Sequence, residues 1–156
     1  MIETPDPGLY RTTQPYPGHE DQIPANVLVY VGSPANGGLN FVVRPGNNRK
    51  NQWFWGEPTI PIRAASWGKT LKALPPEGFY ILPNDLDLGE GGRWVKNAIV
   101  QLGYNGEGRG ILFVGERHET EDRNLLVFSD KGVVIDDGLL SRLTWAAILP
   151  VNAANS

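Results

Sequence analysis

Short runs of apolar residues, separated by glycine, proline and asparagine, dominate the chain. The run Val27-Leu28-Val29-Tyr30-Val31 is rich in β-branched and aromatic side chains, which is typical of a buried strand. The turn residues Ser33 to Gly38 follow it at once. Residues 66–74 predict one or two helical turns, because Pro75 and Pro76 end the helical pattern there. Further strands of the first half are expected at residues 9–13, 39–43, 53–55, 59–62 and 79–82.

The second half of the chain repeats this order of segments. Residues 97–103 match residues 26–32, and residues 110–114 match residues 38–42. The later counterparts keep the same order: 124–128 for 53–55, 132–135 for 58–62, 139–144 for 66–74, and 148–150 for 81–83. Self-similarity in a fixed order favours an internal duplication. The alternative is one larger β-sandwich without internal symmetry.

The pattern predicts an all-β fold made of two tandem, small five-stranded barrels of the SH3-like kind, with short helical turns. The connection between them is short, so we expect the two barrels to pack on each other. The expected boundaries are an extended Pro/Gly-rich arm at 1–25, a first β unit at 26–83, a linker at 84–92, a second β unit at 93–151 and a tail at 152–156.

Composition narrows the chemistry that the chain can perform. Its 19 glycines and 13 prolines favour many turns over long helices. It has no cysteine, so disulfides, thiolate metal sites and thiol catalysis are excluded. No apolar stretch approaches the roughly 18 residues of a membrane span, and the first residues carry neither a basic region nor an apolar run. We therefore expect a cytoplasmic protein that has no membrane partner.

Positive charge is concentrated in one segment, although the whole chain has a net charge of −3. Basic and aromatic residues interleave between positions 44 and 72, and this segment is the candidate binding face. Exposed rings beside cations could bind a peptide or a cation, or stack on the bases of single-stranded nucleic acid. The alternative is that the rings fill a core, because one face of a strand must be buried. The candidate binding residues are Arg49, Lys50, Trp53, Trp55, Trp67 and Lys69.

Candidate catalytic groups are few. His19 and His118 both lie beside carboxylates, and a hydrolase could use both histidines if the fold brings them together. Neither histidine belongs to a metal-binding spacing motif, so we expect solvated loops, no metal site and no cofactor. No serine lies in a nucleophile elbow. We assign no catalytic residue.

These observations favour a non-catalytic protein-binding, adaptor or inhibitor-type module that uses the aromatic and basic face of the first β unit. The expected partner is another protein or a second copy of the chain. The first alternative is a small-barrel protein that binds single-stranded nucleic acid through the same residues, but the acidic pI of about 5.4 argues against it. The second alternative is a hydrolase that uses His19, His118 and nearby carboxylates.

Overall fold

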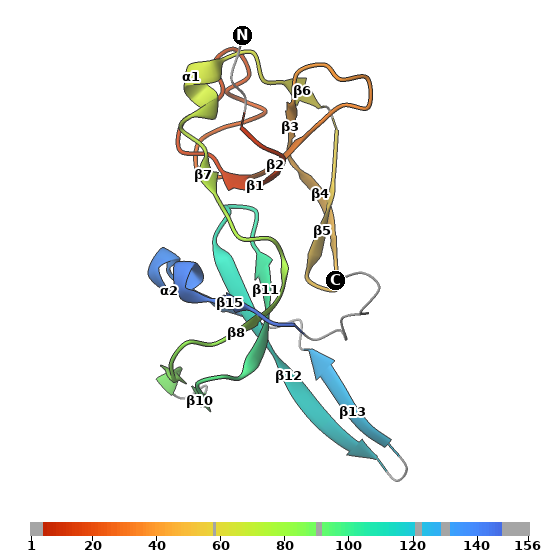
Figure 1. The fold of residues 1–156 in the computed structure, drawn as a ribbon, viewed down its shortest axis with the longest axis vertical. Helices are drawn as coiled ribbons and strands as arrows, with labels where there is room; N and C mark the ends of the chain where they lie inside the picture. The colour runs from red at the N-terminus through yellow and green to blue at the C-terminus, as the bar shows by residue number, and fades with distance from the viewer. Residues whose placement is uncertain (1–4, 58, 90–91, 121–122, 129–131, 148–156) are drawn as a thin grey trace.

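The computed structural model describes residues 5–57, 59–89, 92–120, 123–128 and 132–147, and for residues 116–128 it describes the backbone alone. One sheet forms the upper part of the molecule and a second sheet forms the lower part (Figure 1). We refer to residues 5–74 as the first unit and to residues 75–147 as the second unit.

The first sheet is antiparallel throughout and has the strand order β6-β3-β2-β1-β7. The one-turn helix α1 (Ala65–Gly68) connects β6 to β7. After β3 the chain leaves the sheet and forms a separate hairpin of β4 (Pro45–Arg49) and β5 (Gln52–Trp55). The strands of the sheet are β1 (Gly8–Arg11), β2 (Leu28–Gly32), β3 (Phe41–Val43), β6 (Ile60–Pro61) and β7 (Lys72–Ala73).

The second sheet has the strand order β13-β12-β11-β8-β15, and β14 also pairs with β12. Helix α2 (Asp137–Arg142) follows β14 and begins at Asp136, whose side chain accepts a hydrogen bond from Leu139 N. A short ribbon of β9 (Leu86–Asp87) and β10 (Arg93–Trp94) lies between β8 and β11 in the chain. The strands of the sheet are β8 (Gly78–Ile81), β11 (Ile99–Tyr104), β12 (Gly110–Thr120), β13 (Arg123–Phe128), β14 (Val133–Val134) and β15 (Thr144–Trp145).

Both sheets follow one plan. The order β7-β1-β2-β3-β6 of the first sheet corresponds to β15-β8-β11-β12-β14 of the second. In the chain, a short helix precedes β7 in the first sheet and β15 in the second. The registers correspond as well, because Gly8 lies opposite Val31 and Gly78 lies opposite Leu102. Both glycines have φ near +150°, which a side chain would disfavour.

Details around the first strand of each unit also correspond. The hydroxyl of Tyr10 donates to the carbonyl oxygen four residues earlier in the chain, and the hydroxyl of Tyr80 does the same. Asn26 and Asn97 both have positive φ, of 60° and 72°. The N–H of Asn26 bonds to Thr12 O and that of Asn97 bonds to Leu82 O. The two units therefore correspond residue by residue around their first strands.

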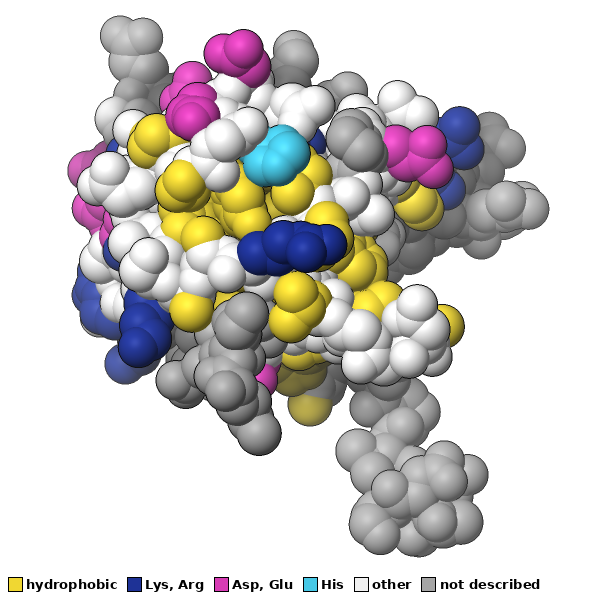
Figure 2. Space-filling view, turned by 90° about the horizontal axis from the view of Figure 1, so that it is seen from above, with side chains coloured by type: hydrophobic (Ala, Val, Ile, Leu, Met, Phe, Trp, Pro, Cys, Tyr) yellow, Lys and Arg dark blue, Asp and Glu magenta, His cyan; other side chains and the backbone are white. Residues whose placement is uncertain are grey.

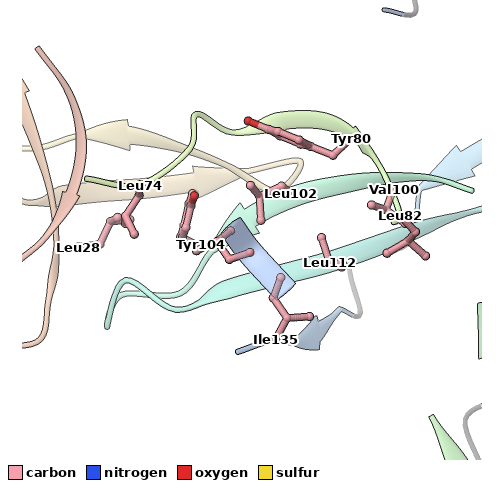
Figure 3. Packing of buried hydrophobic residues seen from close by; sticks show 10 residues of the cluster. Leu28, Leu74, Tyr80, Leu82, Val100, Leu102, Tyr104, Leu112 and Ile135 are labelled. Carbon is pink, nitrogen blue, oxygen red and sulfur yellow. The ribbon is translucent and has the colours of Figure 1, made fainter. Parts of the chain in front are cut away.

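The larger hydrophobic cluster joins the two units. Leu28 and Leu74 of the first unit pack with residues of the second, among them Leu82, Leu102 and Leu112 (Figure 3). Leu28 is fully buried, and its backbone N–H donates to Gly106 O at 2.9 Å. A separate cluster, which includes Val29, Val31 and Trp67, fills the first unit. Burial of apolar surface between the units is thus a main reason that they pack together.

Strands predominate and the helices of the described residues are short, which confirms the all-β prediction. The prediction of closed SH3-like barrels is wrong. In the first sheet the edge strands β6 and β7 are two residues long and do not pair with each other, so the sheet stays open. No helix of the described chain is long and apolar enough to cross a membrane.

Strand pairing runs across the expected boundaries between segments. Strand β1 lies within the segment expected as an arm, 1–25, and pairs with β2 in the first sheet. Strand β8 lies within the expected first unit, 26–83, and pairs with β11 in the second sheet. The expected linker, 84–92, contains β9. The expected tail, 152–156, and the matched segment 148–150 lie outside the described residues.

Candidate functional site

The two tryptophans of β5 face the protein. The indole Nε1 of Trp53 donates to Tyr104 O of the second unit at 2.7 Å, and its backbone N–H donates to the carboxylate of Glu77 at 3.3 Å. The ring of Trp55 stacks on Tyr30, with ring centroids 5.3 Å apart. Both tryptophans are half-buried. Their rings therefore attach the β4–β5 hairpin to the rest of the molecule.

The outer face of the same hairpin carries the exposed aromatic residue. Phe54 is 52% exposed, and Arg49 and Lys50 at the hairpin tip are exposed as well. Lys50 and Asn51 have φ of 52° and 67°, which is the geometry of a two-residue type I′ turn. The aromatic and basic patch of this hairpin therefore consists of Phe54, Arg49 and Lys50, because alternation along β5 turns Phe54 away from its neighbouring tryptophans.

Trp67 and Lys69 lie apart from that hairpin. Trp67 in α1 is 3% exposed, its Nε1 donates to Gln14 O at 2.8 Å, and its ring packs edge-on against Tyr16. The ring of Trp67 is part of the core of the first unit and is not accessible to a partner. Lys69 follows α1 and is exposed. Figure 1 shows α1 at the top of the first unit and the β4–β5 turn at its lower end, so the six candidate residues do not form one face.

The two histidines lie on segments at opposite ends of the molecule. His19 belongs to the connection between β1 and β2 in the first unit, and its Nδ1 lies 3.0 Å from Gln22 Oε1. His118 lies on β12, in the part that pairs with β13. Figure 1 shows the β12–β13 hairpin extending from the bottom of the second unit. Among the residues whose side chains are described, no group of three histidine or acidic side chains could hold a metal ion.

A groove at the upper end of the first unit contains residues that the sequence pattern did not single out. A hollow of about 550 Å³ adjoins a second hollow of about 280 Å³, and Thr59, Pro61 and Arg63 line both. We refer to the two hollows together as the Arg63 groove. Figure 2 views this end, where hydrophobic side chains gather around a basic side chain and beside a histidine. The remaining lining residues are Tyr16, Pro17, His19, Gln22, Ile60 and Ala64 in the larger hollow, and Pro34, Asn36, Gly38, Leu39 and Phe41 in the smaller one.

Tyr16 fixes the wall between the groove and the core. Its hydroxyl donates to Pro61 O at 2.9 Å and accepts a hydrogen bond from Arg63 N at 3.0 Å. Tyr16 is 4% exposed, and the ring of His19 packs edge-on against it. The side chain of Arg63 is exposed, and it forms no ion pair with the residues that the structure describes. The groove therefore offers a guanidinium between apolar walls. Proline clustering at 15–24 and 58–61, which the sequence analysis assigned to an arm and a strand, is the signal that could have pointed to this groove.

An ion cluster holds the two units together. Arg11 of β1 donates from Nη1 and Nη2 to the two carboxylate oxygens of Asp137 in α2, at 3.1 Å and 2.7 Å. Lys72 donates to the same carboxylate at 3.0 Å, and Arg109 lies 3.7 Å from it. The hydrogen bond from Arg11 is the main cause that lowers the pKa of Asp137 to about 2. The carboxylate is thus committed to the contact between the units.

Glu77 is the one group of this contact region whose pKa moves toward neutrality. Burial raises the pKa of Glu77 to about 7, and the hydrogen bond from Trp53 N partly opposes that rise. Its position beside the base of the β4–β5 hairpin connects its protonation to the packing of that hairpin on the second unit.

The comparisons with known proteins give no relative from which a role could be transferred. Neither a protein-family model, nor a curated protein sequence, nor a solved structure matches this chain.

Proposed function

We propose that the protein is a non-catalytic protein-binding module and that the Arg63 groove binds an extended segment of another protein. The observation that carries the proposal is the exposed side chain of Arg63, which lines both hollows together with apolar and polar side chains. Binding sites of this kind combine apolar walls with a few polar groups that fix orientation.

The chemistry of the groove selects the kind of segment. Arginine binds carboxylates through two parallel hydrogen bonds, so an aspartate or glutamate of the partner is expected opposite Arg63. Tyrosine, phenylalanine and proline line the hollows on either side, and such surfaces suit extended or proline-containing segments. The preferred segment is therefore an acidic residue flanked by apolar or proline residues.

The groove belongs to the first unit alone. The hydrogen bonds of Ile62 to Asn40 O and of Ile135 to Gly110 O make these two isoleucines equivalent, so Arg63 corresponds to Asp136. The second unit thus carries the opposite charge at this position, and that aspartate caps α2. We infer that the two units are copies of one ancestral unit and that only the first kept, or acquired, a groove for a partner.

The two alternative functions remain predictions without support from the described contacts. Binding of single-stranded nucleic acid through Trp53 and Trp55 would need rings that are free to stack, whereas both rings pack on protein groups. A hydrolase that uses His19 with His118 would need the two segments to meet.

Selection of random peptides displayed on phage tests the proposed function. We expect enrichment of peptides in which an acidic residue is flanked by apolar or proline residues. Arg63→Glu should weaken their binding by at least about tenfold, because it places like charges opposite each other. Arg49→Glu makes the same change of charge on the exposed hairpin and serves as the matched control. Failure to enrich any such peptide, or equal binding by the Arg63→Glu variant, would refute the proposal.

A further inference from the structure

A row of three residues at the lower end of the first sheet is covered by the second unit. Leu28, Arg11 and Lys72 lie opposite one another on β2, β1 and β7. Leu28 is fully buried and Arg11 is 5% exposed. The second unit covers this row with the loop between β11 and β12 and with the start of α2, because Gly106 O accepts from Leu28 N and Asp137 accepts from Arg11 and Lys72.

The second sheet ends in the equivalent row, which nothing in the described chain covers. Ile99, Ile81 and Thr144 lie opposite one another on β11, β8 and β15. Ile99, the counterpart of the fully buried Leu28, is 48% exposed. Exposed apolar surface at a position where the equivalent unit forms an interface indicates a contact that another molecule can complete.

The first unit carries the counterpart of the covering loop at its free upper end. The N–H of Gly37 bonds to Pro34 O, as that of Gly108 bonds to Asn105 O, and the two glycines have φ of 77° and 73°. The loop 34–37 therefore has the turn of the loop 105–108. Its residues Ala35, Asn36 and Gly37 are exposed.

The side chains on the two free surfaces are matched. The strand register makes Leu39 equivalent to Arg109, and counting on from Ile62 and Ile135 places Ala64 at the position of Asp137, although as helix caps Ala64 and Asp136 correspond. Apolar residues thus replace the charged groups of the internal contact on both free surfaces. In the Ile99 row, Ile81 occupies the position of Arg11. On the loop surface of the first unit, Ala64 and Leu39 occupy the positions of Asp137 and Arg109. The contact of charged residues inside the molecule therefore has an equivalent between its two ends in which Thr144 replaces Lys72 and apolar side chains replace the other charged groups. Apolar groups that face each other are complementary.

The hairpins extend in the direction that this contact requires. Figure 1 shows β4–β5 running from the first unit down beside the second, and β12–β13 running beyond the lower end of the second unit. The first hairpin contacts the second unit through Asn51, which donates to Gln101 Oε1 at 2.8 Å. The second hairpin is formed by the outer part of β12, beyond its pairing with β11, and by β13, as the first hairpin follows β3, so it extends past the second sheet.

We propose that the chain associates head to tail, with the Ile99 row of one copy docked on the loop 34–37, Leu39 and Ala64 of a second copy. The contact repeats between molecules the packing that joins the two units within one molecule. Because the two surfaces differ, the association is heterologous and builds rings or open chains rather than closed two-fold dimers. Leu39 and Ala64 also line the Arg63 groove, so this self-association goes beyond the proposed function and uses a surface next to the site for an acidic segment.

Sedimentation velocity of the purified full chain tests the proposal. The mean mass should rise above the 17.1 kDa of one chain as concentration increases toward about 1 mM. Ile99→Asp should weaken the association by about a hundredfold, because it places an unpaired charge against apolar groups. Phe54→Asp, which changes another exposed apolar residue outside the contact, should leave the association unchanged. A monomer at all concentrations, or equal loss in both variants, would overturn the proposal.

A mixing experiment separates head-to-tail contact from any other geometry. Ile99→Asp and Leu39→Asp each damage one of the two surfaces, so each variant alone should be monomeric. An equimolar mixture retains one intact pair of surfaces and should form a complex of twice the chain mass, which goes no further. A mixture that stays monomeric while the unmodified protein associates would contradict the proposal. Peptide binding to the Ile99→Asp variant is measured in parallel, so that loss of self-association and failure of the Arg63 groove are distinguished.

Discussion

Replacing Asp137 by alanine removes both oxygens that hold the buried guanidinium of Arg11. The side chain of Arg11 is 6% exposed, and Gly108 O, at 3.4 Å, is its other hydrogen-bond acceptor. Breaking a buried ion pair by removing one partner costs about 3–5 kcal/mol of stability. Since Asp137 is 33% exposed and water can reach that side, we expect about 3 kcal/mol, a large part of the stability of a typical domain.

Urea unfolding followed by tryptophan fluorescence measures this loss. A decrease of about 3 kcal/mol should lower the urea midpoint by about 1–2 M. Asp85→Asn is the matched control, because Asp85 pairs with Arg93 on the surface and should change the midpoint little. The double variant Arg11→Met with Asp137→Ala should be more stable than Asp137→Ala alone, because it no longer buries an unpaired charge. Equal midpoints for Asp137→Ala and Asp85→Asn would refute the assigned role of the ion cluster.

Three further changes test the contact between the units. Because the pKa of Asp137 is lowered to about 2, its contribution to stability should be full above about pH 4 and lost as the pH falls toward 2, which acid titration of the unfolding free energy checks. Because the pKa of Glu77 is raised to about 7, the free energy of unfolding should fall as the pH rises from 4.5 to 7 and the buried carboxyl loses its proton. We expect a decrease of about 1–2 kcal/mol after screening by water. Urea melts at pH 5 and pH 8 should show this decrease in the unmodified protein but not in Glu77→Gln. Gly108→Ala should destabilise by about 1–3 kcal/mol, measured by thermal unfolding, because φ there is +73° and the new Cβ would lie 2.9 Å from Cγ of Arg11.

Local patterns predicted most of the individual elements. The apolar run 27–31 contains most of β2, the aromatic segment 53–55 lies in β5, and the segment 79–82 overlaps β8. The prediction of a helical turn at 66–74 anticipated α1, although the helix begins one residue earlier and ends at Gly68. Alternation and turn residues report such elements reliably, because burial of one face and the conformations of glycine and proline are local properties.

Pairing between distant strands could not be read from those patterns. Strand β8 has an apolar composition that suits either sheet, and only its register with β11 assigns it to the second. The proline-rich segment around Tyr16 was expected to be an extended arm, whereas Tyr16 is buried and fixes the wall of the Arg63 groove. The residue types next to a position in the sequence indicate whether its side chain is buried, but not which part of the fold covers it.

The candidate binding face shows the same limit. Arg49 and Lys50 are exposed, as a binding face requires, but Trp53 and Trp55 turn toward the protein and Trp67 fills the core. The core interpretation of these rings was the alternative stated from the sequence. Tryptophan is suited to both roles, because its large apolar ring fills cores while its N–H needs one hydrogen-bond acceptor.

Hydrogen exchange at the amide of Leu28 tests most directly whether the second unit covers the end of the first. This N–H donates to Gly106 O, so it should exchange only when the whole molecule unfolds, at a rate similar to that of the neighbouring strand amide of Val29. NMR-detected exchange in dilute solution makes the comparison within one sample. If Leu28 instead exchanged as fast as the exposed loop residue Ala35, the packing of the two units described above would be wrong.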